Sequence, residues 1–350
     1  MHLFVQNIFS FQQPLYIPSL IFAKFYDDDE FVKDVPIYEC RTTGESYDDF
    51  NLVNRIILAY QLVEKKHLGN SMWQLFYDLK FHPIHDVFQS GNLEEESNIL
   101  RNPGQIEHFY GIDNICSSIL PFHFTDSSLI GLATGSLDCL VRFGEAIGSI
   151  KLKNSETPFP IPRKWCVDEV LNVIESKLKI TIDFPNPYPD EIGIYTSKGT
   201  ASYRAIQALY QAYRIKELLK DIPNPRVLEI GSGLGRTAYY CRLFGIKDYT
   251  IIDLPMTVLA SSYFLGRVVG ESLDDSQNKI KILTPSQFIN DTTQYDLIVN
   301  AASLTEMDIN TIHMYLDKIQ KTTKMFLSIN HEINTYSVNE LLSYSKNIKN

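Results

Sequence analysis

The chain has 350 residues, which is enough for about two domains of ordinary size and for a large buried core. Hydrophobic residues make up 44% of it and charged residues 21%, and these values exclude collagen-like, low-complexity and wholly disordered chains. With 32 basic against 42 acidic side chains the formal net charge is -10, so no general electrostatic attraction draws the chain to phosphate backbones or anionic lipids. We therefore expect no nucleic-acid partner.

Cysteine usage and the N-terminal sequence both favour a cytoplasmic protein. The cysteines include no CxxC pair, a distribution typical of neither a disulfide framework nor a zinc site. Residues 1–22 are apolar, but they lack a basic start and are interrupted by Gln and Pro, so we predict packed structure and no membrane span there. The cysteines are Cys40, Cys116, Cys139, Cys166 and Cys241.

Helical patterns come first along the chain. Apolar residues recur at helical spacing over 49–65 and 71–79, and prolines then crowd between 155 and 194 around a predicted helix over 167–178. We place a domain boundary near residue 190. This predicts a mainly helical N-terminal domain, residues 1–190, and a second domain, residues 191–350.

The second domain alternates between helical and strand-like patterns. A long amphipathic helix is predicted over 200–219, and five short β-branched runs follow it, separated by helical stretches. This order predicts an α/β fold with a doubly wound, mostly parallel, Rossmann-like sheet, whose ligand lies beyond the carboxyl ends of the strands. The runs are Arg226–Ile230, Tyr249–Ile252, Lys279–Leu283, Tyr295–Asn300 and Lys324–Ile329.

A glycine-rich turn follows the first of these strands. The run VLEIGSGLGR contains Gly231, Gly233 and Gly235, which let the backbone approach a ligand and point helix N-terminal amides at a negative group. The dinucleotide fingerprint GxGxxG needs glycine where this chain has Arg236, and the Lys-Ser/Thr pair of a phosphate loop is absent too. The turn therefore predicts a small-ligand site that fits neither nucleotide phosphate motif.

An acidic residue ends the second predicted strand. Asp253 comes 22 residues after Gly231 and precedes Leu254, and a carboxylate there can accept both hydroxyl hydrogens of a ribose. Together these features resemble motif I and the following acidic position of class I S-adenosylmethionine-dependent methyltransferases, in which an acidic residue, here Glu229, comes two positions before the first glycine. The alternative is that the glycines only form a tight turn and that Asp253 caps the next helix.

Longer sequence blocks are similar to the sugar O-methyltransferase family of bacterial glycan and glycosylated natural-product clusters. The similarity covers residues 100–335 and implies methyl transfer from S-adenosylmethionine to a hydroxyl of a sugar or glycan. It also implies that the N-terminal domain shapes the acceptor pocket, as a lid, or serves in assembly. The blocks are TSKGTASYRAIQALYQAYRI (196–215), VLEIGSGLGRTAYYCRLFGIKDYTIIDLPMT (227–257), YFLGR (263–267), NAASLTEM (300–307) and SINHE (328–332), with LRNPGQIEHFYGID (100–113) and CLVRFGEAIGSIKL (139–152) upstream.

A sugar hydroxyl needs a proton acceptor, because it is a poor nucleophile at neutral pH. We predict that His331, which follows the fifth strand and is largely neutral at pH 7, is the general base. Glu332 or Glu306 would orient its imidazole or bind a sugar hydroxyl. The alternative is that His331 caps the strand and bonds the backbone.

Small polar residues follow the fourth strand. We predict that Asn300 binds the cofactor and that Ser303 binds the acceptor, because loops at this edge commonly carry function. The alternative is helix-start chemistry, with Thr305 or Asp308 as an N-cap. The cluster lacks the (D/N)PPY sequence of amino-group methyltransferases, so amide or base methylation is disfavoured.

The helix before the first strand carries Tyr203, Gln207, Tyr210 and Arg214 along one face. In the family interpretation Tyr203, Tyr210 and Arg214 bind the acceptor, and Tyr210 or Arg214 could instead reach the methionine carboxylate. The alternative is an ordinary buried stripe with an Arg whose charged end reaches water.

No metal is predicted. His82 and His85 form an HxxH pair that has no third ligand in the sequence. Carboxylates hold a divalent ion in some other sugar O-methyltransferases, and Glu306, Asp308 or Glu332 could do so here, but nothing in the sequence requires it.

The chain is short after the fifth strand. A class I methyltransferase sheet continues with a helix and two antiparallel strands that need about 40–50 residues, whereas 18 remain after Glu332. The fifth strand would then be an exposed parallel edge. We therefore predict either a homodimer partner that covers it or a C-terminally truncated sheet with reduced or absent activity.

These observations predict a cytoplasmic S-adenosylmethionine-dependent sugar O-methyltransferase. Two alternatives stay open. One is a NAD-dependent sugar-modifying oxidoreductase on a similar sheet, and the other is a catalytically inactive relative that keeps the fold as a binding or assembly module.

Overall fold

The computed structural model describes residues 2–7, 37–39, 49–62, 82–103, 126–151, 166–188, 191–270, 280–330 and 337–343. The predicted helix over 71–79 and the catalytic candidates His331 and Glu332 lie outside these residues. Internal contacts divide the chain into two units, which we describe separately. The first takes in residues 1–12, 44–111 and 211–350, and the second takes in residues 13–43 and 112–210.

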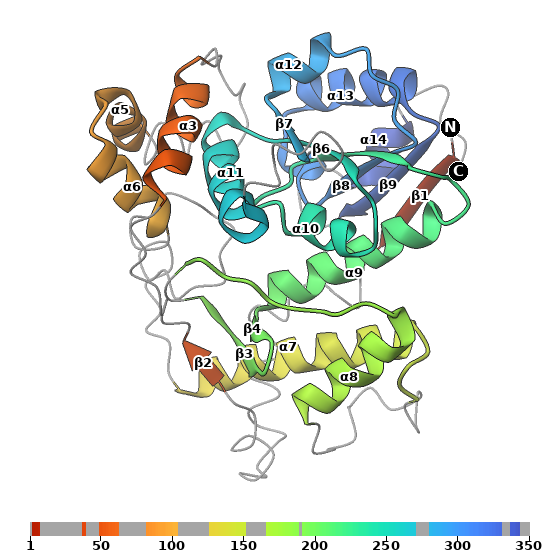
Figure 1. Cartoon of the computed structure of the whole chain (residues 1–350). Helices are drawn as coiled ribbons and strands as arrows, with labels where there is room; N and C mark the ends of the chain where they lie inside the picture. The colour runs from red at the N-terminus through yellow and green to blue at the C-terminus, as the bar shows by residue number, and fades with distance from the viewer. Residues whose placement is uncertain are drawn as a thin grey trace. The chain divides into compact units, whose positions relative to one another are not determined.

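The first unit is built on a six-stranded sheet in the order β1-β9-β8-β5-β6-β7 (Figure 1). Every pair of neighbouring strands in it is parallel, which confirms the predicted doubly wound sheet. Because both faces are covered, neighbouring residues such as Val227 and Leu228 are equally buried. The strands are β1 (His2–Asn7), β5 (Arg226–Ile230), β6 (Asp248–Ile252), β7 (Ile280–Leu283), β8 (Leu297–Ala301) and β9 (Met325–Asn330).

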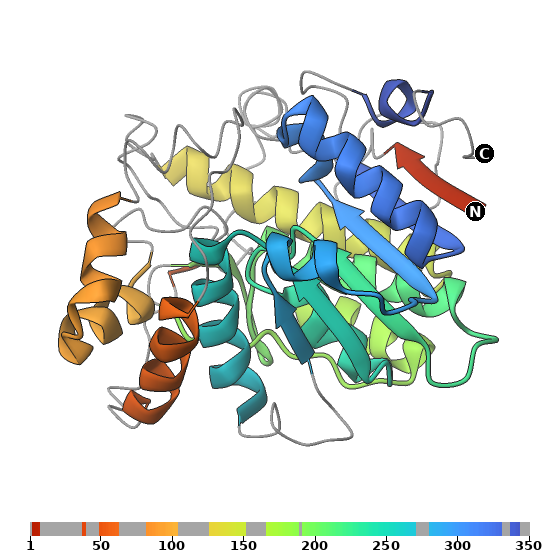
Figure 2. The same ribbon diagram turned by 90° about the horizontal axis from the view of Figure 1, so that it is seen from above.

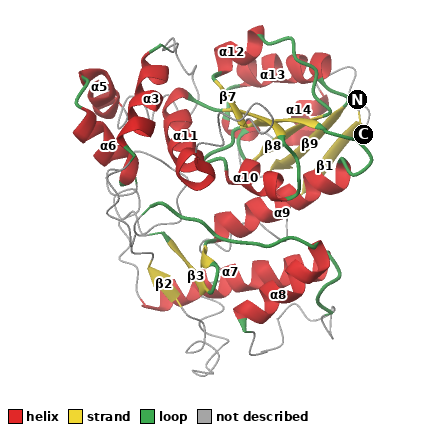
Figure 3. Cartoon of the chain, viewed as in Figure 1, coloured by secondary structure: helices red, strands yellow, loops and turns green. Residues whose placement is uncertain are grey.

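Helices cover both faces of this sheet (Figure 3). On one face Leu228, Ile298 and Phe326 form a buried apolar cluster with Tyr315 of α13 and Leu341 of α14. The described helices of this unit are α3 (Phe50–Gln61), α5 (His82–Ser90), α6 (Leu93–Arg101), α10 (Arg236–Leu243), α11 (Pro255–Val269), α12 (Pro285–Asn290), the 3-10 helix η3 (Leu304–Glu306), α13 (Ile309–Thr322) and α14 (Val338–Ser343).

Strand β1 pairs with β9 in parallel register, from His2 opposite Met325 to Asn7 opposite Asn330. Figure 2 shows β1, in red, at one end of the six-stranded sheet. Strand β9 is therefore paired on both sides, and the prediction that it forms an exposed edge is wrong. The physical reason is that the N-terminal segment supplies the backbone hydrogen-bonding partner that the C-terminal segment was expected to provide. A homodimer is not needed to cover this edge, and the oligomeric state stays a prediction.

Helices α3, α5 and α6 belong to the sheet-containing unit, although they precede residue 190. Helix α3 contacts α11, α5 and α6. The division of the chain therefore differs from the single boundary predicted near residue 190, because 44–111 goes with the sheet and 191–210 with the other unit.

The second unit contains α7 (Asp126–Ala146), α8 (Val167–Leu178) and the first part of α9 (Tyr203–Leu218). Its small antiparallel sheet has the order β2-β3-β4, formed by β2 (Ile37–Glu39), β3 (Ile192–Thr196) and β4 (Gly199–Ala201). The expected helix start at Thr200 is wrong, because Thr200 pairs with Tyr195 in this sheet. The helix begins after Ser202, whose side chain accepts a hydrogen bond from Ala205 N–H at 3.2 Å.

In the described part of the chain, no helix is long and apolar enough to cross a membrane.

Removal of residues 1–7 should lower the melting temperature. The deletion leaves the N–H and C=O groups along one side of β9 unpaired, and each 1 kcal/mol lost corresponds to about 2–4 °C in a domain of this size. We expect a decrease of at least this amount by thermal circular dichroism. An unchanged melting temperature would show that β1 does not stabilise β9.

Candidate functional site

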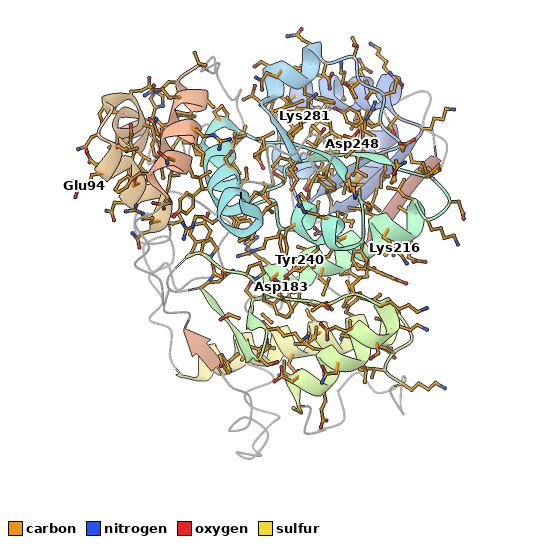
Figure 4. All side chains as sticks on the ribbon, in the orientation of Figure 1. Glu94, Asp183, Lys216, Tyr240, Asp248 and Lys281 are labelled. Carbon is orange, nitrogen blue, oxygen red and sulfur yellow. The ribbon has the colours of Figure 1, made fainter. Side chains whose placement is uncertain are left out.

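The glycine-rich turn lies at the carboxyl end of β5 and leads into α10. Gly231 has a φ of +76° and Gly233 a φ of +56°, and Gly235 is the N-cap of α10. A Cβ on Gly233 would meet no atom within 4 Å, so open space lies over this residue. The predicted glycine turn is present, and the space beside its central glycine, Gly233, is not filled by other residues. Asp248 and Lys281, near the amino ends of β6 and β7, mark the opposite edge of the sheet (Figure 4).

Asp253 follows β6 and reaches across to the glycine turn. Its Oδ2 accepts a hydrogen bond from Gly233 N–H at 2.8 Å, and its Oδ1 accepts one from Leu254 N–H, also at 2.8 Å. Because Leu254 is the N-cap of α11, one carboxylate joins the turn after β5 to the start of α11. Burial raises the pKa of Asp253 to about 6.

Gly231 lies against the turn that follows β8. A Cβ on Gly231 would be 2.0 Å from Ser303 Oγ and 2.4 Å from Ser303 Cβ. The Ser303 hydroxyl donates to the Ile230 carbonyl at 3.1 Å. Ser303 therefore supports the end of β5, and its predicted contact with an acceptor would have to compete with this hydrogen bond.

Asn300 is fully buried, and its amide has four hydrogen bonds inside the protein. Nδ2 donates to the Ile230 carbonyl at 2.9 Å and to Ser303 Oγ at 2.6 Å. Oδ1 accepts from Leu304 N–H at 3.1 Å and from Asn330 Nδ2 at 2.9 Å. Since an amide has two donor hydrogens and two acceptor positions, none is left for a ligand. The side chain of Asn300 therefore connects β5, β8 and β9, and cofactor binding by this residue stays a prediction.

The turn after β8 has an unusual backbone. Ala302 is exposed and has a φ of +58°, which is rare for a residue other than glycine and costs on the order of 1–3 kcal/mol. Its N–H donates a hydrogen bond to the Ile329 carbonyl at 2.8 Å. Glu306 ends η3 and is half-buried at this same edge. Asp308 caps α13, as the helix-start interpretation predicted.

Glu229 lies on β5, two residues before Gly231, and is buried. Its Oε2 accepts a hydrogen bond from the Tyr249 hydroxyl at 3.0 Å. Burial raises the pKa of Glu229 to about 8, so its carboxyl group is largely protonated at pH 7. Its contact with a cofactor stays a prediction.

The α9 candidates differ in their surroundings. Tyr210 is buried and packs edge-to-face on Phe143 at 6.0 Å between ring centroids, as the buried-stripe interpretation predicted. Tyr203 and Arg214 are half-buried. Tyr203 and Tyr210 belong to the second unit, whereas the glycine turn belongs to the first. Acceptor binding by these residues stays a prediction.

Ser232, in the middle of the glycine turn, is not among the site residues predicted from the sequence. Its hydroxyl oxygen is buried, and the hydroxyl lies close enough to the Asp253 carboxylate to lower the pKa of that group. The only sequence signal was its place between two glycines.

The described residues include no group of three His, Cys, Asp or Glu side chains placed to hold a metal ion. Nδ1 of His85 is 2.7 Å from the Tyr60 hydroxyl. The side chain of His82 lies outside the described part.

No protein-family model and no curated protein matches the sequence. Solved structures with some similarity include the methyltransferase domain of bacterial CtHen1, with a TM-score of 0.32 and 16% identity over 40% of this chain and 82% of that one. The glycopeptide N-methyltransferase MtfA, solved with S-adenosylmethionine, has a TM-score of 0.29 and 18% identity over 34% of this chain and 53% of its own. Magnesium protoporphyrin IX methyltransferase from Synechocystis has a TM-score of 0.27 and 12% identity over 36% and 57%.

Alanine at Gly231 should be far more damaging than alanine at Gly233. Both substitutions meet a positive φ, but only Gly231→Ala adds a Cβ that overlaps Ser303. We expect Gly233→Ala to cost about 1 kcal/mol and Gly231→Ala to cost clearly more, measured by chemical denaturation. Equal losses in the two variants would contradict the close approach of the two turns.

Proposed function

We propose that this chain is an S-adenosylmethionine-dependent methyltransferase that acts on a sugar hydroxyl. The use of S-adenosylmethionine as methyl donor is supported by one observation. Asp253, after β6, is hydrogen-bonded to Gly233 in the turn after β5, at the carboxyl edge of a parallel sheet. A nucleoside bound at this edge would present its ribose hydroxyls to Asp253. The sugar acceptor is supported by the similarity of residues 100–335 to sugar O-methyltransferases.

The residues at the turn fit an adenosine that carries a charged sulfur. Each Asp253 oxygen accepts one hydrogen bond from the backbone, and a ribose hydroxyl would share the remaining acceptor capacity with the nearby side chains of Ser232 and Thr257. Open space lies over Gly233, where a ligand could approach the backbone of the turn.

A dinucleotide fits less well. The third glycine of the fingerprint lets helix and strand pack closely, but this position holds Arg236. Arg236 is buried, and its guanidinium carbon lies 5.8 Å from the centre of the Phe264 ring on α11. The oxidoreductase alternative therefore has no supporting observation in the site.

S-adenosylmethionine supplies, when bound, a methyl group already activated by a sulfonium. The chain then has to align donor and acceptor and to remove a proton. Asp253 and the turn would orient the ribose, and Asn300 and Ser303 would keep the β8 turn against the β5 turn. Glu306 offers a carboxylate at the same edge to accept a hydrogen from the acceptor. His331, directly after β9, would take the proton of the attacking hydroxyl.

The proposal is tested by binding and by transfer. Isothermal titration calorimetry should detect S-adenosylhomocysteine but not NAD. Labelled S-adenosylmethionine, incubated with nucleotide sugars and short glycans, should give products with the mass of one added methyl group. Binding of NAD alone would replace the proposal with the oxidoreductase, and binding without transfer to any acceptor would favour the inactive relative.

His331→Ala should separate the general base from the strand cap. A lost base lowers kcat by about 10²- to 10⁴-fold and leaves S-adenosylhomocysteine affinity and melting temperature unchanged. If His331 only caps the strand, the variant should instead have a lower melting temperature and nearly the same kcat. Glu332→Ala is the neighbouring control, for which we expect a smaller loss of kcat.

Binding of S-adenosylhomocysteine should weaken below pH 6. The Asp253 carboxylate accepts ribose hydrogens only when ionised, and with a pKa of about 6 it is mostly protonated at pH 5. We expect about tenfold weaker binding at pH 5 than at pH 7 by calorimetry, since about a tenth of the carboxylate then stays ionised. Asp253→Asn should bind weakly at both pH values, and circular dichroism at pH 5 controls for unfolding.

A further inference from the structure

Helix α3 is tied to α11 by buried polar contacts at two places. Both helices belong to the first unit and lie side by side (Figure 1). The helices are also very close beyond Tyr263, because a Cβ on Gly266 of α11 would be 2.6 Å from Leu52 Cδ1 of α3. A shift of one helix is therefore transmitted to the other.

The first tie lies at the start of α11. The Tyr60 hydroxyl of α3 donates to Met256 Sδ at 3.1 Å and lies 2.7 Å from His85 Nδ1 of α5. A phenol has one hydrogen, so when it points at the sulfur the hydrogen of the second bond comes from His85. All three residues are buried. Their two hydrogen bonds then run in the same direction, from α5 through α3 to the first turn of α11.

The second tie lies further along α11. Asp49, the N-cap of α3, accepts hydrogen bonds from Tyr263 of α11 at 2.6 Å and from Arg101 of α6. Tyr263 comes seven residues after Met256, which is about 10 Å along a helix. The two ties each use one buried tyrosine hydroxyl, but only the first is close to the start of α11.

The start of α11 is also part of the candidate site. Met256 is three residues after Asp253, with the N-cap Leu254 and the N1 proline between them. Proline fixes its own φ near −65°, so this short connection has little freedom. A shift in the first turn of α11 therefore moves the Asp253 carboxylate, whose productive geometry tolerates about 0.5 Å.

We propose that Tyr60 is a positioning residue of the donor site: through Met256 it holds the first turn of α11 so that Asp253 faces the glycine turn. The inference rests on the proposed function, because the ligand concerned is the nucleoside part of the methyl donor. In this arrangement α3 and α5 support the donor site, a role different from that of a lid over the acceptor.

The test compares Tyr60→Phe with Tyr263→Phe in the full chain. Each variant loses one buried hydroxyl from the same pair of helices, so both should have a lower melting temperature. We expect Tyr60→Phe to weaken S-adenosylhomocysteine binding about three- to tenfold, the range of one net hydrogen bond. Tyr263→Phe should change that affinity by less than about twofold, because its tie lies far from Asp253.

Met256→Leu provides an independent variant that removes the sulfur acceptor and nearly conserves volume. It should weaken binding as much as Tyr60→Phe does, and the double variant should be no weaker than either single one. Such non-additivity would not arise if the hydroxyl contributed only to global stability.

The outcomes separate this inference from the proposed function. Unchanged affinity in Tyr60→Phe, or equal losses in the two tyrosine variants, overturns the positioning role while the proposed function stands. Failure of the wild-type chain to bind S-adenosylhomocysteine overturns the proposed function and this inference with it.

Discussion

The hydrogen bond between the Asp253 carboxylate and Gly233 N–H organises the candidate site. It joins residues that follow two neighbouring strands, so the glycine turn and the start of α11 have one fixed relation. The carboxyl ends of parallel strands collect such groups at one edge, where helix N-termini also meet. Burial at this edge raises the pKa of Asp253, and the backbone amides of Gly233 and Leu254 offset only part of that rise.

The polar residues at the end of β8 and in the turn after it support this arrangement. The carbonyl of Ile230 ends β5 and needs hydrogen-bond donors, and Asn300 and Ser303 supply them. Their side chains keep two turns in contact, and Ala302 is left exposed at the edge in a strained conformation. Residue types that suggest ligand binding in the sequence thus have a supporting role, because a buried backbone carbonyl competes for the same donors.

The helices before the glycine turn have a different place from the one expected of an N-terminal domain. Helices α3, α5 and α6 pack with α11 in the unit that contains the sheet. Their polar ties satisfy buried carboxylate, imidazole and phenol groups within one helical layer. Residues far from the glycine turn in sequence can therefore influence the donor edge without touching it.

Local patterns in the sequence determined the strands β5–β9, the helix α8, the glycine turn and the position of Asp253, because strand and helix periodicities and turn residues are encoded within a few neighbours. Only the tertiary structure decided the pairing of β1 with β9, the partners of Asn300 and the ties of Tyr60 and Asp49. Apart from the contacts of Asn300 with Ser303 and Leu304 in the same turn, these contacts join residues 25 to more than 300 positions apart. An asparagine or tyrosine suits a ligand or an internal partner equally well, and only the folded chain shows which one it has.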